Sequence, residues 1–185
     1  IKKNIKKKIK YNHLLRVAIN NKLISISLRE KVKIDKNFSL KIINYKRVSP
    51  EYKNLKYNII LRHLSKLNTI KSDIALIVHN KVLETGTSNL LFATSDKIFS
   101  PINKFYKGTN LKFFEKKFKI IKKNIFIHDL NKFDEIILVG SGKGVTQVKY
   151  IKEAKWKRKK EKIYKKLLSV YNQEIKKQKN IYKFL

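Results

Sequence analysis

Cysteine and methionine are both absent from this sequence of 185 residues. Without cysteine the chain forms no disulfide, no cysteine-ligated zinc site and no thiol nucleophile. No apolar run approaches the roughly 20 residues that span a bilayer, and the first residues do not resemble a signal peptide. We therefore expect a soluble, cytoplasmic protein without a membrane partner. The lack of methionine, with Ile1 as the first residue, indicates a fragment that lacks its true N-terminus.

Acidic residues are scarce, since 13 Asp and Glu stand against 46 Lys and Arg and give a formal net charge of +33. Only five of the basic residues are arginine, and the lysines are spread among Asn and Ile, as a genome poor in G and C would encode them. A field this positive attracts polyanions without sequence preference. A basic nucleic-acid-binding protein is therefore one alternative. Its densest basic run is 155–160, which includes Trp156 and Arg158.

The hydrophobic fraction of 42% predicts a buried core, and the spacing of apolar residues predicts the elements around it. We expect strands at 14–19, 23–28, 38–45, 74–78, 89–93, 97–99 and 133–139, and helices at 57–67, 111–121 and 157–177. Alternation at 23–28 and 38–45 is typical of half-buried antiparallel strands. Residues 1–10 also alternate and fit either a strand or a helix end. Without a regular βαβ rhythm, this order favours an α+β fold or an irregular α/β fold.

Glycine is rare, and three of the five glycines fall in the run Gly140-Ser141-Gly142-Lys143-Gly144, directly after the apolar strand that ends at Val139. A small-residue turn at the end of a strand exposes several backbone N–H groups in one direction. Such a nest, with the Ser141 hydroxyl, can hold a phosphate or a carboxylate. A tight turn between two strands is the alternative. The run is not a P-loop, because its spacing differs and no GK[ST] follows.

The other two glycines lie in polar turns. Gly86 belongs to 84–89, where Glu84 precedes small hydroxyl residues, a pattern that also fits an ordinary solvated turn or cap. Gly108 stands just before the helix expected from 111, so Thr109 or Asn110 is the expected N-cap. That helix N-terminus is a second place where an anion could bind. Together, two candidate anion sites and the carboxyl of Glu84 fit a ligand that carries charged groups.

Four segments, in this order, resemble the class IV aminotransferases, a family that uses pyridoxal phosphate (PLP). Residues 53–57, after Arg47 and Pro50, are similar to the family's segment with the Schiff-base lysine, and 84–92 to its Glu-x-x-(Thr/Ser)-(Ser/Glu)-Asn-(Leu/Ile)-Phe segment. Pro101 and 107–110 resemble its Pro…Pro-Gly-Ile-Thr loop, with lysine in place of the second proline. Residues 134–142 resemble its final strand and phosphate turn.

The resemblance implies a mixed α/β, class IV aminotransferase-like fold in two parts. Residues 1–46 would be the C-terminal part of the small N-terminal domain, and 47–185 the large PLP-binding domain. Most of the small domain is missing, including the His-x-x-Arg segment whose arginine binds the cofactor phosphate. His13 and Arg16 have that spacing but lie too close to Lys53 along the chain, so Arg16 is expected to be structural.

The resemblance also assigns roles to single residues. Lys53 would bond covalently to the cofactor and move the substrate α-proton, with Lys56 as the alternative. Glu84 would pair with the pyridinium nitrogen and keep the ring electron-withdrawing. The cofactor phosphate would be bound by Thr109, Asn110, Ser141 and the backbone N–H of Gly142. Backbone around Gly142 and Lys143 would meet the substrate carboxylate.

The activity implied is that of a PLP-dependent lyase or aminotransferase acting on a small amino-acid-like substrate. Our first expectation is 4-amino-4-deoxychorismate lyase, which releases pyruvate and 4-aminobenzoate on the folate route. A branched-chain or D-amino-acid transaminase is the alternative, and an inactive relative is a third interpretation. The resemblance further implies a homodimer. The four histidines show no metal-site spacing, so no metal is expected.

Overall fold

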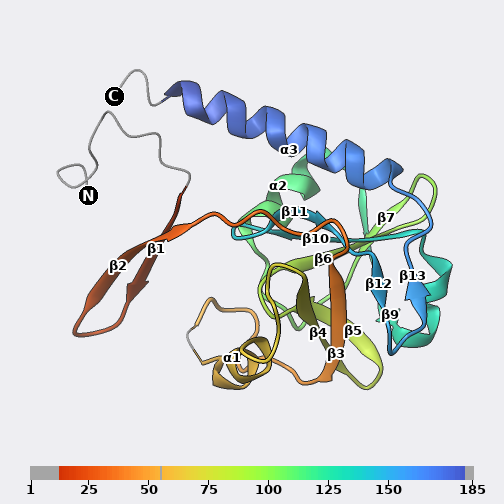
Figure 1. Ribbon diagram of the computed structural model, residues 1–185, viewed down its shortest axis with the longest axis horizontal. Helices are drawn as coiled ribbons and strands as arrows, with labels where there is room; N and C mark the ends of the chain where they lie inside the picture. Colours follow the sequence, from red (N-terminus) through yellow and green to blue (C-terminus); the bar gives the residue numbers. More distant parts are fainter. Residues whose placement is uncertain (1–12, 55, 182–185) are drawn as a thin grey trace. The chain divides into compact units, whose positions relative to one another are not determined.

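The computed structural model describes residues 13–54 and 56–181 (Figure 1). Its helices are α1 (Asn58–Leu64), α2 (Thr109–Lys117), α3 (Lys162–Ile181) and a 3-10 helix at Ile127–Lys132. Its strands are β1 (His13–Ile19), β2 (Ile24–Glu30), β3 (Ser39–Asn44), β4 (Ser72–Val78), β5 (Lys81–Thr85), β6 (Asn89–Ala93), β7 (Ile98–Ser100), β8 (Ile120–Lys122), β9 (Ile125–Phe126), β10 (Glu135–Gly140), β11 (Gly144–Gln147), β12 (Tyr150–Ile151) and β13 (Trp156–Lys157). The predicted α+β class is confirmed, and residues 1–10 lie outside the described part.

The chain divides into two compact units, Ile1–Lys33 and Ile34–Leu185. This division falls before the boundary at 46/47 that the sequence predicts, because β3 pairs with β4 and β12 of the second unit. In the first unit, β1 and β2 form an antiparallel hairpin. One face of the hairpin is apolar, made by the cross-strand pairs Leu15 with Leu28, Val17 with Ile26 and Ile19 with Ile24. The assignment of the units to a small and a large domain stays a prediction.

Two sheets make up the second unit. One has the strand order β11-β10-β6-β7-β8, and the other β13-β12-β3-β4-β5-β9. The antiparallel pairing expected for residues 38–45 is wrong, because β3 runs parallel to both of its neighbours, β4 and β12. The turn after β4 is tight, since His79 and Asn80 have φ of 48° and 60°. Asparagine tolerates this left-handed region better than most residues.

The core has two main parts. One lies between the two sheets, and the other lies between the sheet that contains β10 and the helices α2 and α3. Along β10, Ile136 and Leu138 pack into the cluster between the sheets, whereas Ile137 and Val139 pack into a second cluster with α2 and α3. A strand buried on both faces explains the apolar run at 136–139, because successive side chains point to opposite faces. Figure 1 shows α3 lying along β10 and β11. Strand β10 therefore holds the Gly140–Gly144 turn at the end of a fully buried element.

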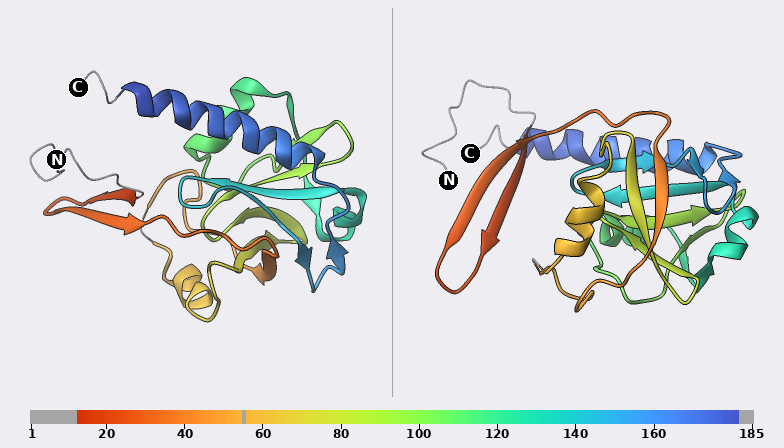
Figure 2. Two further views of the ribbon diagram at one scale, coloured as in Figure 1. Left: turned by 45° about the horizontal axis from the view of Figure 1, so that its top comes forward. Right: turned by 60° about the horizontal axis from the view of Figure 1, so that its bottom comes forward.

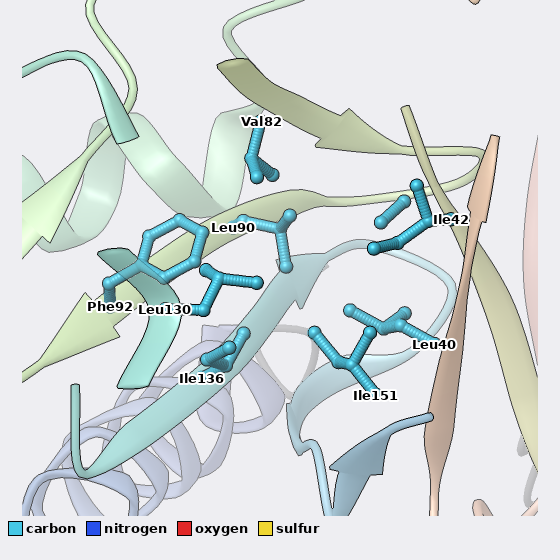
Figure 3. Close-up of a pocket in the computed structure, with 9 residues that line it drawn as sticks. Leu40, Ile42, Val82, Leu90, Phe92, Leu130, Ile136 and Ile151 are labelled. Atoms are coloured by element: carbon cyan, nitrogen blue, oxygen red, sulfur yellow. The ribbon is translucent and has the colours of Figure 1, made fainter. Parts of the chain in front are cut away.

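Helix α1 covers the outer face of the other sheet, where Ile60 and Leu64 pack against Ile74 and Leu76 of β4 (Figure 2). The order of layers is thus α1, sheet, sheet, and then α2 with α3. A gap of about 10 Å³ remains between the sheets, lined only by apolar side chains (Figure 3). A cavity this small and apolar is a packing defect, since a buried water needs polar partners.

All three α-helices differ from the predicted bounds, and α1 is the shorter Asn58–Leu64 within the predicted 57–67. Residues 111–121 do not form one helix, because α2 ends at Lys117 and residues 120–122 pair as β8 with β7. Helix α3 begins at Lys162 instead of 157, since Trp156 and Lys157 form β13 beside β12. In both places strand pairing to the sheet overrides the local apolar spacing. None of the helices in the described part of the chain is long and apolar enough to cross a membrane.

Candidate active site

Glu84 lies near the end of β5 and is buried, with 3% of its surface exposed. Arg47 donates from Nε to Glu84 Oε1 at 3.0 Å and from Nη2 to the Gly86 carbonyl at 3.2 Å. Burial nevertheless raises the pKa of Glu84 from 4.5 to about 7, because one guanidinium and a backbone hydrogen bond from Tyr106 offset only part of the desolvation. This carboxyl is therefore suited to a further cationic or N–H donor.

The segment at 106–110 is fixed beside Glu84 by Asn89. The Asn89 amide donates to the Tyr106 carbonyl at 2.7 Å, and its Oδ1 accepts from the Gly108 N–H at 3.0 Å. A Cβ on Gly108 would lie 2.9 Å from this same Oδ1, so the close approach requires glycine. One asparagine thus positions the whole entry to α2.

Helix α2 begins differently from the prediction. Its N-cap is Gly108, not Thr109 or Asn110, and no side chain caps the helix. Thr109 is exposed, whereas the Asn110 side chain places Nδ2 in a buried position where no hydrogen-bond partner is found. The unpaired amide and the uncapped helix N-terminus are free to donate to an anion.

The Gly140–Gly144 turn joins β10 to β11 as an antiparallel hairpin, so it is a tight turn between two strands. A Cβ on Gly140 would lie 2.5 Å from Ser88 Oγ, whereas a Cβ on Gly142 would meet no atom within 4 Å. Ser141 and Gly142 are exposed. The turn is thus packed against Ser88 at its start and exposed at its centre, where a ligand can reach Ser141 and Gly142.

Strand pairing brings these segments together. Val139, at the end of β10, stands opposite Asn89 of β6. Asn89 also binds the Gly108 N–H, so the glycine turn that follows Val139 lies near the start of α2. Glu84 approaches the same place from β5, because residues 85–88 form the turn that connects β5 with β6. The second unit therefore brings Glu84, the α2 entry and the glycine turn together as a candidate site.

Lys53 lies in the segment before α1 and is exposed, as is Lys56. The ammonium of Lys53 is 6.0 Å from the centroid of the Tyr106 ring, which belongs to the segment held beside Glu84. The structure thus gives Lys53 a contact at the edge of the site. The choice between the two lysines stays a prediction.

Sequence reasoning missed Arg47, Asn89, Tyr106 and Asp73. Arg47 had a signal, because it is one of only five arginines, and Asp73 stands beside the apolar run at 74–78. Asn89 also had a signal, because it is the asparagine of the motif at 84–92. Tyr106 had none, since its role depends on hydrogen bonds between segments distant in the sequence.

Phosphate and pyridine groups both match donors and acceptors of this site. The orphaned Asn110 Nδ2, the open space at Gly142 and the α2 N-terminus suit an anion. The buried Glu84 suits a protonated ring nitrogen. A separate hollow of about 240 Å³ lies at the opposite end of β5, lined among others by His79, Lys81 and Lys104. In the described residues, no three His, Asp or Glu side chains gather as metal ligands.

Solved structures that share this fold include aminotransferases and a putative lyase. A branched-chain aminotransferase of Thermoproteus uzoniensis with norvaline matches with a TM-score of 0.68 and 15% identity, over 81% of this chain and 56% of that one. A putative 4-amino-4-deoxychorismate lyase of Legionella pneumophila matches with a TM-score of 0.70 and 16% identity, over 81% and 60%. An aminotransferase of Brucella abortus bound to PLP matches with 0.66 and 18%, over 81% and 58%.

These identities are low, so the structural matches establish the fold alone. The chain spans somewhat more than half the length of each of these structures. No curated protein matches it in sequence. The model of the family named amino-transferase class IV, whose enzymes are PLP-dependent, matches residues 1–151, which is most of the chain. This protein therefore belongs to the class IV aminotransferase family.

Proposed function

We propose that this chain carries most of the PLP site of a PLP-dependent lyase, with 4-amino-4-deoxychorismate as the substrate. The observation that carries the cofactor part is the buried Glu84, whose pKa is raised to about 7 beside Arg47. A buried carboxyl short of positive charge gains from the N–H of a protonated ring. The α2 entry and the glycine turn, which we propose bind an anion, would receive the phosphate of the same ligand.

PLP, when bound, supplies an electron sink for the carbanion at the substrate α-carbon. The remaining work belongs to the chain. Glu84 would hold a proton on the ring nitrogen, and the Lys53 amine would bond to the cofactor and take the proton from the substrate α-carbon. The phosphate would be held by Thr109, Asn110, Ser141 and the Gly142 N–H. Backbone of Gly142 and Lys143 would receive the substrate carboxylate.

One feature supports the lyase over a transaminase of branched-chain or D-amino acids. The formal net charge of +33 attracts anions, and aminodeoxychorismate carries two carboxylates and one amine, whereas a branched-chain amino acid carries one of each. The homodimer and the cytoplasmic location stay predictions.

A nucleic-acid role receives less support. Trp156, the aromatic residue of the densest basic run, is 1% exposed and donates from Nε1 to the Phe133 carbonyl at 3.0 Å. It is therefore closed to stacking on a base. Two basic residues of the run are already paired, Arg158 with Glu161 at 2.7 Å and Lys160 with Asp134 at 3.1 Å.

The test is to incubate the protein with PLP, reduce with borohydride, wash with salt and map the modified peptides. We expect label concentrated on Lys53, lost in Lys53→Ala and kept in the matched control Lys56→Ala. Label that follows Lys56 would move the catalytic role there. Label scattered over lysines by exposure would refute an organised site. Pyruvate release from aminodeoxychorismate, compared with transamination of leucine and D-alanine, then decides between lyase and transaminase.

A further inference from the structure

Lys143 belongs to the glycine turn, yet its side chain points into the protein and is only 9% exposed. Its ammonium lies 2.9 Å from Asp73 Oδ2 and 3.0 Å from Thr87 Oγ1. It also lies 5.3 Å from the centroid of the Phe38 ring. Most lysines of the described residues are exposed, whereas the ammonium of Lys143 is largely desolvated and contacts Asp73, Thr87 and Phe38 instead of water.

Asp73, on β4, is the acceptor at the centre of this set and is fully buried. Its Oδ2 accepts from Thr85 Oγ1 at 3.1 Å and from Thr87 Oγ1 at 2.6 Å. Its Oδ1 would lie 2.9 Å from a Cβ on Gly86, so the turn passes directly over the carboxylate. Asp73 therefore holds the 85–88 turn, which follows Glu84 immediately.

The Lys143–Asp73 pair links two turns that are distant in sequence. A fully buried carboxylate is costly unless a cation and hydrogen bonds compensate it, and Lys143 is the cation in contact with Asp73. The 85–88 turn also packs against Gly140 through Ser88. The glycine turn is thus attached at both of its sides, by backbone packing at Gly140 and by the ion pair at Lys143.

We propose that Lys143 is a positioning residue, whose ammonium fastens the glycine turn to Asp73 and so holds Ser141 and the Gly142 N–H in place for the cofactor phosphate. This inference rests on the proposed function, which assigns the phosphate to those two residues. The side chain itself does not contact phosphate or substrate, because Asp73 and Thr87 occupy it.

The experiment measures dissociation constants for PLP and for pyridoxal, which lacks the phosphate, by equilibrium dialysis. The variants are Lys143→Met and Asp73→Asn, with the exposed Lys152→Met as the control for loss of one positive charge. We expect both pair variants to weaken PLP binding by about 10-fold or more, as loss of a supporting contact does in ligand sites. Pyridoxal binding should change by less than about twofold, because only the phosphate contacts depend on the turn.

The two pair variants distinguish positioning from simple attraction. If Lys143 acted only through its charge, Asp73→Asn would raise the positive potential and tighten PLP binding; positioning requires that it weaken binding. The double variant Asp73→Asn/Lys143→Met leaves no unpaired buried charge and so keeps the protein folded where a single variant does not. Its affinity for PLP should equal that of the single variants.

Three results would overturn the inference: unchanged PLP affinity in Lys143→Met or in the double variant, equal losses for PLP and pyridoxal, or tighter binding by Asp73→Asn. Failure of the proposed function is separate, since the unaltered protein would then not bind PLP at all.

Discussion

Replacement of Glu84 by glutamine should remove a pH dependence that this carboxyl imposes on stability. The folded protein holds the Glu84 proton more tightly than the unfolded chain, because burial raises its pKa from 4.5 to about 7. The stabilisation from this proton is fully present below pH 4.5 and is lost as the pH rises through about 7. At about 1.4 kcal/mol for each pH unit, the loss amounts to about 3 kcal/mol.

The assay is urea unfolding of the protein and of Glu84→Gln, without PLP, at a series of pH values from about 4.5 to about 8.5. Subtracting the two free energies of unfolding cancels the titration of all other groups that the substitution leaves unchanged. Glutamine resembles the protonated carboxyl, so the variant should gain about 3 kcal/mol relative to the unaltered protein across this range. Most of the gain should fall below pH 7.

A matched control is Asp96→Asn. The hydrogen bond from Lys162 lowers the pKa of Asp96 below 3.8, so this carboxyl is ionised in both states throughout the measured range and its difference curve should be flat. A flat curve for Glu84→Gln as well would refute the reasoning, because it would mean that the pKa of Glu84 is the same in the folded protein and in the unfolded chain. A curve of the opposite sign would mean that the pKa of Glu84 is lowered in the folded protein, so that the effect of Arg47 exceeds the effect of burial.

Two further predictions concern the glycine turn and Arg47. Gly140→Ala should cost about 1–3 kcal/mol of unfolding free energy, because the new Cβ would lie 2.5 Å from Ser88 Oγ, whereas Gly142→Ala, with no atom within 4 Å, should cost less than about 0.5 kcal/mol. Equal costs in urea unfolding would contradict this close approach. Arg47→Met should raise the pKa of Glu84 further, since the guanidinium lowers it. The assay repeats the Glu84→Gln difference curve in an Arg47→Met background. Its inflection should then move to higher pH. A move to lower pH would show that Arg47 does not stabilise the carboxylate.

Local pattern predicted the three α-helices and five strands of the second unit, β3, β4, β6, β7 and β10, but it did not predict the short strands β5, β8, β9, β11, β12 and β13. The apolar run at 136–139 predicted β10, and the glycine-rich segment after it predicted a turn at the end of that strand. These features depend on neighbours along the chain, through side-chain alternation and backbone freedom at glycine. The direction of β3, the early end of α2 and the late start of α3 depend on distant strands, so local pattern could not supply them.

The site divides in the same way. The sequence by itself determined the order of the motifs at 53–57, 84–92, 107–110 and 134–142, and with it the candidate residue types: a lysine, a glutamate and two turns proposed to bind an anion. Only the tertiary structure decided their environment. The pairing of β6 with β10 places Asn89 beside the glycine turn. The packing of the sheets buries Glu84 beside Arg47, and it buries Asp73 beside Lys143. The burial and charge pairing of a side chain depend on atoms that are far apart in the sequence, and these atoms come together only when the sheets pack.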